Sequence, residues 1–227
     1  MASNKNKEER ATVVDNLDNR LSSASAKIAK NKKIIYICVG LILAVGAFVL
    51  SYIFIYLNPR LQNSWEAYNK VVAMEKRDNL DAAKLADEYR KVATNFSSTP
   101  AGDVSALAAA EYYYDAKNYD EAIKLLKDMG IGDPVLKAQS QALLGDCYVN
   151  KKQYEDALAA FDQAIKTADG NPALVPAYMF KKGVIYDHQK KYDDAISCFE
   201  DIKKNYPTFM GAEIDFYIES EKAQAGK

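Results

Sequence analysis

The chain has 227 residues, of which 49% are hydrophobic and 27% are charged, and its formal net charge is −1. That length allows one medium-sized domain with appended segments. A nucleic-acid-binding surface needs clustered basic charge, so this balance argues against nucleic acid as a ligand.

The first 33 residues are basic. They contain eight Lys or Arg and four Asp or Glu, which gives 8 − 4 = +4. Apolar residues recur in this tail at spacings of 3, 4, 3 and 4: Val14, Leu17, Leu21, Ala24 and Ile28. This stripe predicts an amphipathic helix. The helix could lie on an anionic membrane surface, or it could form a short coiled coil with a partner or with a second copy of the chain.

Residues 34–57 contain no charged side chain. A helix of that length is about 36 Å long, which is enough to cross the hydrocarbon core of a membrane. A cleaved signal peptide would have a shorter apolar stretch and a small-residue cleavage site after it, but Asn58, Pro59 and Arg60 follow here. The segment is therefore predicted to be an uncleaved transmembrane helix.

The flanking charges predict the orientation of this helix. The fifteen residues before it contain five Lys or Arg, and the fifteen after it contain two. By the positive-inside rule, residues 1–33 form a cytoplasmic tail and residues 58–227 form an extracytoplasmic domain. In a Gram-negative bacterium the protein would be a single-pass protein of the inner membrane, with its C-terminal domain in the periplasm.

The extracytoplasmic part is predicted to be helical throughout. Residues 61–77 and 80–96 have apolar positions at helical spacing, and Thr99 followed by Pro100 is typical of a helix start. Residues 209–223 are predicted to form a closing helix with a polar outer face, which a repeat stack needs in order to end in water.

One residue pattern occurs three times in this part, at Tyr119–Ala122, Tyr154–Ala157 and Tyr192–Ala195, and its alanines are 35 and then 38 residues apart. A period of this length indicates stacked helical repeats. The fold class is therefore all-α. Gly145 and Gly183 are predicted to let two helix backbones approach closely.

The sequence offers no recognisable catalytic or metal site, so we expect no enzymatic activity, no cofactor and no metal. His188 is the only histidine, and Cys147 and Cys198 lie at different repeat positions. Free thiols are favoured for these two cysteines, although a disulfide stays open in an oxidising compartment.

These repeats resemble the tetratricopeptide repeat (TPR), whose 34-residue pattern has Leu-Gly-x2-Tyr in the first helix and Ala-x3-Phe in the second. Residues 138–171 match it at Leu144, Gly145, Tyr148, Ala157 and Phe161, and residues 176–209 match it at Gly183, Tyr186, Ala195, Phe199 and Pro207. Residues 103–136 match it at Tyr113, Ala122 and Pro134. The resemblance implies an α-solenoid with about three clear repeats, preceded by a degenerate helix pair at 60–96.

In this family the first helix of each pair lines the concave side. The resemblance would place eight residues of this chain there: Glu111, Tyr114, Asp115, Asp146, Asn150, Phe180, Lys181 and Asp187. Aromatic side chains among acids suit an extended peptide or a partner helix of basic character. A purely solvated face is the alternative.

The whole layout resembles the bacterial membrane-anchored TPR proteins, among them the ancillary subunit of the Sec translocon. The run from Ser98 to Leu107 is similar to Bacteroidetes versions of that family. The resemblance implies protein partners, namely the translocon and periplasmic chaperones. Three alternatives remain: a scaffold for another cell-envelope assembly or secretion complex, a structural homo-oligomer, and an enzyme.

Overall fold

The computed structural model describes residues 32–77, 80–128 and 130–227. The chain divides into two compact units, with the boundary between Pro59 and Arg60. The predicted amphipathic stripe of the basic tail lies outside the described residues and stays a prediction.

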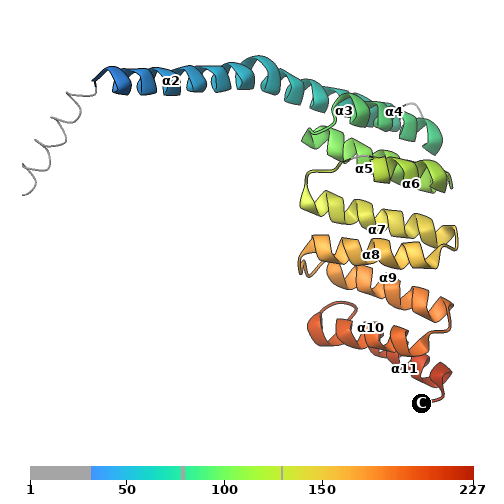
Figure 1. Ribbon diagram of the computed structural model, residues 1–227. Helices are drawn as coiled ribbons and strands as arrows, with labels where there is room; N and C mark the ends of the chain where they lie inside the picture. Colours follow the sequence, from blue (N-terminus) through green and yellow to red (C-terminus); the bar gives the residue numbers. More distant parts are fainter. Residues whose placement is uncertain (1–31, 78–79, 129) are drawn as a thin grey trace, which may run out of the picture. The chain divides into compact units, whose positions relative to one another are not determined.

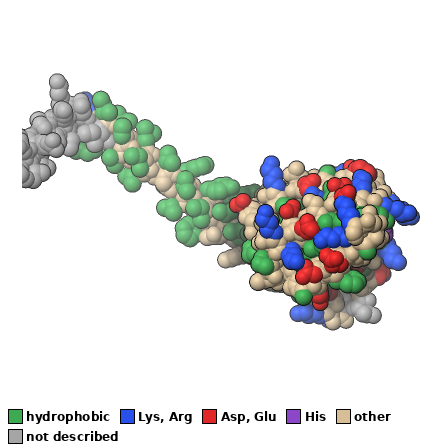
Figure 2. Space-filling view, turned by 90° about the horizontal axis from the view of Figure 1, so that it is seen from below, with side chains coloured by type: hydrophobic (Ala, Val, Ile, Leu, Met, Phe, Trp, Pro, Cys, Tyr) green, Lys and Arg blue, Asp and Glu red, His purple; other side chains and the backbone are tan. Residues whose placement is uncertain are grey.

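The described part of the first unit is an apolar helix. It comprises α2 (Lys32–Ser51) and η1 (Tyr52–Leu57), a short stretch of wider π-helical winding. Among the described residues, this is the only helix long and apolar enough to cross a membrane; its most apolar 18-residue window has a mean hydropathy of 2.7, and none of that window is buried in the protein. Figure 2 shows hydrophobic side chains along it.

The second unit is built from helices that alternate in direction and stack in layers (Figure 1). Residues 60–77 of α3 (Asn58–Arg77) open it. The other helices are α4 (Ala82–Asn95), α5 (Pro100–Asp115), α6 (Tyr119–Asp128), α7 (Pro134–Asn150), α8 (Tyr154–Ala168), α9 (Val175–His188), α10 (Tyr192–Asn205) and α11 (Glu213–Ala225). The described residues contain no strand. The all-α prediction is confirmed, and α3 and α4 lie close to the predicted ranges.

Side-chain caps fix where several helices begin. The Thr99 hydroxyl accepts a hydrogen bond from the Gly102 N–H at 3.1 Å, and Pro100 occupies the first turn. The Asp133 carboxylate accepts the N–H groups of Val135 and Leu136, both at 2.9 Å, and so caps α7. These caps satisfy N–H groups that have no partner inside the helix. The predicted helix start at Thr99 and Pro100 is confirmed.

The turn inside each repeat has the same left-handed residue. Lys117, Lys152 and Lys190 have φ angles of 58°, 59° and 58°. In each turn the next residue donates its N–H to a carbonyl five residues back, at 2.8 to 2.9 Å, which closes the end of the first helix. All three hairpins therefore fold back at one geometry.

A phenylalanine ring lies against the glycine of its own repeat. A Cβ atom added to Gly145 would lie 2.8 Å from Cζ of Phe161, and one added to Gly183 would lie 2.7 Å from Cζ of Phe199. The prediction that these glycines let two backbones approach is therefore wrong in detail, because they make room for a ring. Both rings are at most 1% exposed.

The last helix begins later than predicted. Met210 and Gly211 have φ angles of 57° and 53°, so a tight turn precedes α11, which starts at Glu213 instead of at residue 209. Ile214 and Ile218 of α11 are buried, but Phe216 is 73% exposed. The predicted polar outer face of this helix thus carries one large apolar side chain.

The cysteines of the second unit are free thiols. Cys147 is buried, and burial raises the pKa of its thiol to about 12. It stays protonated at neutral pH and packs as a small apolar residue, as predicted. Cys198 is partly buried, and burial raises the pKa of its thiol as well.

Candidate functional site

The first helices α5, α7 and α9 carry all eight predicted partner-binding residues. We call the surface that they form the first-helix face. On α5 its open stripe consists of Pro100, Val104, Ala108, Glu111 and Asp115, which are at least partly exposed. Spacings of three and four residues put these side chains on one side of the helix.

Four of the predicted residues form a polar network across three consecutive first helices. The Asn150 side chain donates to the Tyr114 hydroxyl at 3.0 Å and accepts from the Tyr119 hydroxyl at 3.1 Å. Lys181 Nζ donates to the carboxylate of Asp146, with its shorter contact at 2.5 Å. The structure therefore brings Tyr114, Asp146, Asn150 and Lys181 together, and much of their polar capacity is used within the protein.

The charges of Lys181 and Asp146 in this network largely cancel each other. The side chains of Lys181 and Asp146 are 42% and 25% exposed. Burial raises the pKa of the Asp146 carboxyl, and the Lys181 ammonium opposes that rise. The same ammonium lies 5.7 Å from the centre of the Phe161 ring. The pair therefore gives the face a fixed dipole and little net charge.

Glu111 and Asp115 are different, because both are exposed and neither makes an ion pair with a cation in residues 32–77, 80–128 or 130–227. Desolvation by the surrounding helices, together with the nearby charge of Asp115, raises the pKa of the Glu111 carboxyl. Two like charges one helical turn apart repel each other. This part of α5 would gain from a cation supplied by another molecule.

The last two predicted residues face α11. Phe180 packs against Phe199 and Tyr217, with ring centres 5.5 and 4.9 Å apart. Asp187 lies next to Glu221 of α11, a carboxyl that is only 4% exposed. These two side chains tie the first-helix face to the closing helix.

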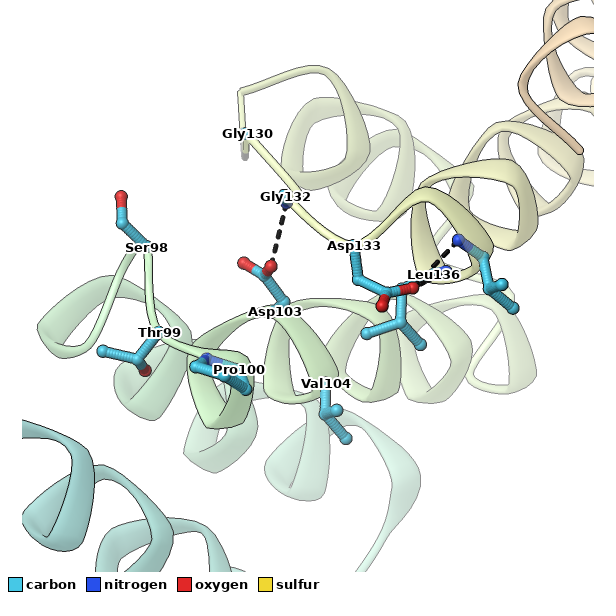
Figure 3. A pocket seen from close by; sticks show the side chains of 10 residues that line it. Ser98, Thr99, Pro100, Asp103, Val104, Gly130, Gly132, Asp133 and Leu136 are labelled. Atoms are coloured by element: carbon cyan, nitrogen blue, oxygen red, sulfur yellow. Dashed lines mark hydrogen bonds between the residues drawn. The ribbon is translucent and has the colours of Figure 1, made fainter. Parts of the chain in front are cut away.

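Two hollows of the second unit adjoin its first helices. One, of about 720 Å³, lies at the N-terminal ends of α5 and α7, and Figure 3 shows Asp103 and Asp133 on its walls. The other, of about 370 Å³, lies between α7 and α9, with Phe161 and Phe180 among its apolar side chains and Asp146, Lys181 and His188 among its polar ones. Both could take side chains of a partner.

The sequence did not reveal an aromatic cluster at the start of the stack. The ring centres of Tyr68 and Tyr89 are 5.9 Å apart, and those of Tyr89 and Tyr112 are 5.7 Å apart. The Tyr89 hydroxyl donates to Glu75 at 2.9 Å. Desolvation and Glu75 raise the pKa of Tyr112 to about 12. The run of three tyrosines at 112–114 was the available signal.

The acidic residues at the start of each second helix link neighbouring parts of the stack. They lie in the first turn of the helix, where the helix dipole favours negative charge. One of each pair also contacts a residue just beyond the C-terminal end of α7, α9 or α11. These contacts are Asp120 with Lys151, Glu155 with Gln189, and Asp193 with Lys227. They repeat along the stack and join each repeat to the next.

In the part of the chain that the structure describes, no three His, Cys, Asp or Glu side chains gather to hold a metal ion. His188 is exposed and stacks on Tyr154 with ring centres 6.4 Å apart. The surface offers unpaired acids, aromatic rings and apolar hollows, which are features of a binding surface.

Comparisons with known proteins agree with this architecture. The sequence profile of the tetratricopeptide repeat matches residues 107–172 and 142–208. A crystal structure of the MamA protein is similar at a TM-score of 0.50 and 19% identity, covering 74% of this chain and 90% of that one. The nearly identical TPR-like repeats of a Podosopora anserina kinesin light chain are similar at a TM-score of 0.56 and 13% identity, covering 74% and 87%. No curated protein sequence gives a significant match.

At these identities the solved structures establish the fold alone. Together with the profile match and the repeated turns, they show that the second unit is a helical solenoid whose residues 107–208 are tetratricopeptide repeats.

Proposed function

We propose that this protein is a membrane-anchored scaffold of the bacterial cell envelope whose TPR domain holds partner proteins on its first-helix face. Tetratricopeptide repeats generally mediate protein–protein interaction, which fits this fold. The observation that carries the proposal is the exposed acidic stripe of α5, because Glu111 and Asp115 have no cationic partner in the described chain.

The membrane anchor in this proposal is the apolar helix of α2 and η1. Its length and hydropathy suit a transmembrane span, and the charge asymmetry of its flanks favours a cytoplasmic N-terminus. The TPR domain would then stand in the periplasm, tethered to the outer surface of the inner membrane.

The specific role that we propose is that of an ancillary subunit linking the Sec translocon to periplasmic chaperones. It rests on the resemblance of the whole layout, from tail to closing helix, to that group of anchored TPR proteins. The net charge of −5 beyond the apolar segment (22 basic and 27 acidic residues) fits partners with basic surfaces.

Affinity purification from detergent-solubilised membranes tests this function. The full-length chain, with a tag at its C-terminus, should recover translocon subunits and periplasmic chaperones, identified by mass spectrometry. Recovery of another envelope complex instead would replace the Sec role with that assembly. Recovery of the chain alone, as a stable oligomer, would indicate a structural homo-oligomer, and recovery of only the monomer would contradict the scaffold.

A further inference from the structure

The larger hollow is bordered by the segment that follows the short second helix of the first TPR unit. α6 has 10 residues, whereas α8 has 15 and α10 has 14. A loop that contains Gly130 and Gly132 follows α6 and forms one wall of the hollow. Figure 3 shows that these glycines present no side chain toward the space between α5 and α7. The volume of about 720 Å³ is large enough for bulky side chains.

The two carboxylates that line this hollow already have partners. The Asp103 carboxylate, 8% exposed, accepts the Gly132 N–H at 2.9 Å. Asp133 caps α7 through its two backbone hydrogen bonds. The apolar lining is less well covered, and Val135 is 46% exposed. Apolar side chains in the hollow therefore remain exposed, whereas its carboxylates already accept hydrogen bonds.

The unpaired acids lie on the same stripe of α5 as this hollow. Val104, which lines the hollow, precedes Glu111 by seven residues and Asp115 by eleven. At 1.5 Å per residue these carboxylates lie about 10 and 16 Å along the helix axis from Val104. An apolar site and a two-charge acidic site thus follow each other on one open surface.

We propose that this surface binds a cationic amphipathic helix of a partner protein. An apolar side chain of that helix fills the hollow beside Val104 and Val135, and Lys or Arg side chains pair with Glu111 and Asp115. A helix lying along α5 meets these sites when its cations stand seven and eleven residues from its apolar anchor, because both helices have the same rise per residue. The inference rests on the proposed function and names the chemistry of the partner.

The acidic charge of this surface favours a cationic helix over anionic lipid or nucleic acid. An acidic surface repels anionic lipid and nucleic acid, and it steers a cationic segment toward the face. The apolar hollow adds a requirement that a purely basic peptide does not meet. Recognition therefore depends on both features, and each can be removed separately.

The test uses the full-length chain in nanodiscs of uncharged phosphatidylcholine, with empty nanodiscs as the blank. The probes are three fluorescein-labelled amphipathic helical peptides. The first has a Leu anchor with Arg at the seventh and eleventh positions after it, the second has Glu in place of both Arg, and the third has Ser in place of the Leu. We expect the first peptide to bind at least tenfold more tightly than either of the others by fluorescence anisotropy.

Variants assign the binding to the named surface. Glu111→Gln combined with Asp115→Asn should weaken binding of the first peptide at least tenfold and reduce its salt dependence. The matched control, Asp156→Asn with Asp201→Asn on second helices, should leave it unchanged. Val135→Trp should fill the hollow and weaken binding, whereas Phe216→Trp, at a more exposed position on α11, should not.

Equal binding of the Arg and Glu peptides, or equal effects of the test and control variants, would overturn the inference. A circular dichroism spectrum like that of the wild type would confirm that each variant is folded. If partners are still recovered from membranes by both test variants, the inference fails and the scaffold function stands. If the first peptide binds as expected but no partner is recovered from membranes, the proposed function fails instead.

Discussion

The glycines of the first helices show how a single residue sets the spacing inside a repeat. Gly145 and Gly183 precede a phenylalanine of the same repeat by sixteen residues, and the ring occupies the volume that a side chain would need. Because Phe161 and Phe199 are almost fully buried, they cannot move aside without opening the core.

Replacing Gly183 with alanine should therefore destabilise the protein. The new methyl group would meet three atoms of the Phe199 ring, two of them at 2.7 and 3.0 Å. The overpacking outweighs the better helix propensity of alanine, and we expect a net loss of about 1–2 kcal/mol. Urea unfolding of the full chain in detergent, followed by circular dichroism, measures it. Gly130→Ala, where nothing lies within 4 Å of the added atom, is the control and should change stability by less.

Glu221 is a buried acid held beside another acid. It is 4% exposed, and its Oε2 atom has no hydrogen-bond partner. Desolvation and the neighbouring Asp187 raise the pKa of its carboxyl. Protonation would relieve this arrangement, because a protonated carboxyl can donate a hydrogen bond to Asp187.

The substitution Glu221→Gln should stabilise the docking of α11 at neutral pH. The amide removes the buried charge and can donate to Asp187, which should raise the free energy of unfolding by about 1–2 kcal/mol. Since the folded-state pKa of Glu221 is raised, the wild-type stability should fall as pH rises from the ordinary carboxyl pKa through the raised one.

The stability advantage of the variant should therefore grow across that window and vanish in more acidic solution. Urea midpoints of both proteins between about pH 4 and 7 measure it. The exposed Glu219→Gln on the same helix is the control. A variant less stable than the wild type at neutral pH would contradict this assignment.

At the scale of elements, the three repeat turns share one backbone geometry. A lysine stands two residues before each repeat tyrosine, and each of these lysines has a left-handed backbone. Left-handed φ angles are costly for residues with a Cβ atom and free of that cost for glycine. The repeat keeps its turn geometry despite that cost.

Lys152→Gly should consequently increase stability by about 0.5–1 kcal/mol, since glycine adopts the φ of 59° without strain. Lys191→Gly is a matched control, because Lys191 has an ordinary φ of −90° and glycine there only adds freedom to the unfolded chain. Thermal midpoints of the two variants should move in opposite directions. A lower thermal midpoint for both variants would show that the left-handed backbone at Lys152 does not reduce stability.

The sequence predicted most helices because their signals are local. Apolar spacing indicated α3 and α4, and Thr99 with Pro100 indicated the start of α5. The predicted start of α11 was wrong because Met210 has a left-handed backbone conformation. A methionine in the sequence gives no sign of that conformation. Contacts between repeats, such as Asp120 with Lys151, depend on residues 31 apart and became visible only in three dimensions.

The sequence predicted only those parts of the candidate site that depend on position within a repeat. Repeat position placed Glu111 and Asp115 on a first helix, and the structure exposes both side chains. Repeat position could not show that Lys181 pairs with Asp146, or that Phe180 packs under α11, because those contacts depend on side-chain directions across repeats. The hollow beside Val135 is lined in part by the loop that follows α6, and repeat position does not specify the course of that loop.

At the scale of the whole molecule, the two units present different surfaces. The described part of the first is an apolar helix whose side chains have no cover within the protein, and the second is a TPR solenoid with mixed charge on its surface (Figure 2). In the proposed function, the first unit holds the protein at the membrane and the second holds a partner. Glu111 and Asp115 of α5 are exposed acids of the second unit that could pair with a partner's cations.

Photo-crosslinking in intact membranes tests this account most directly. Benzoylphenylalanine would be placed at Glu111 on the first-helix face and, in a separate variant, at the exposed Asp201 on α10. The account predicts that position 111 forms a discrete adduct with another envelope protein and that position 201 does not. Adducts at 201 alone, or none at either position under conditions where partners co-purify, would show that the first-helix face is not where this protein binds.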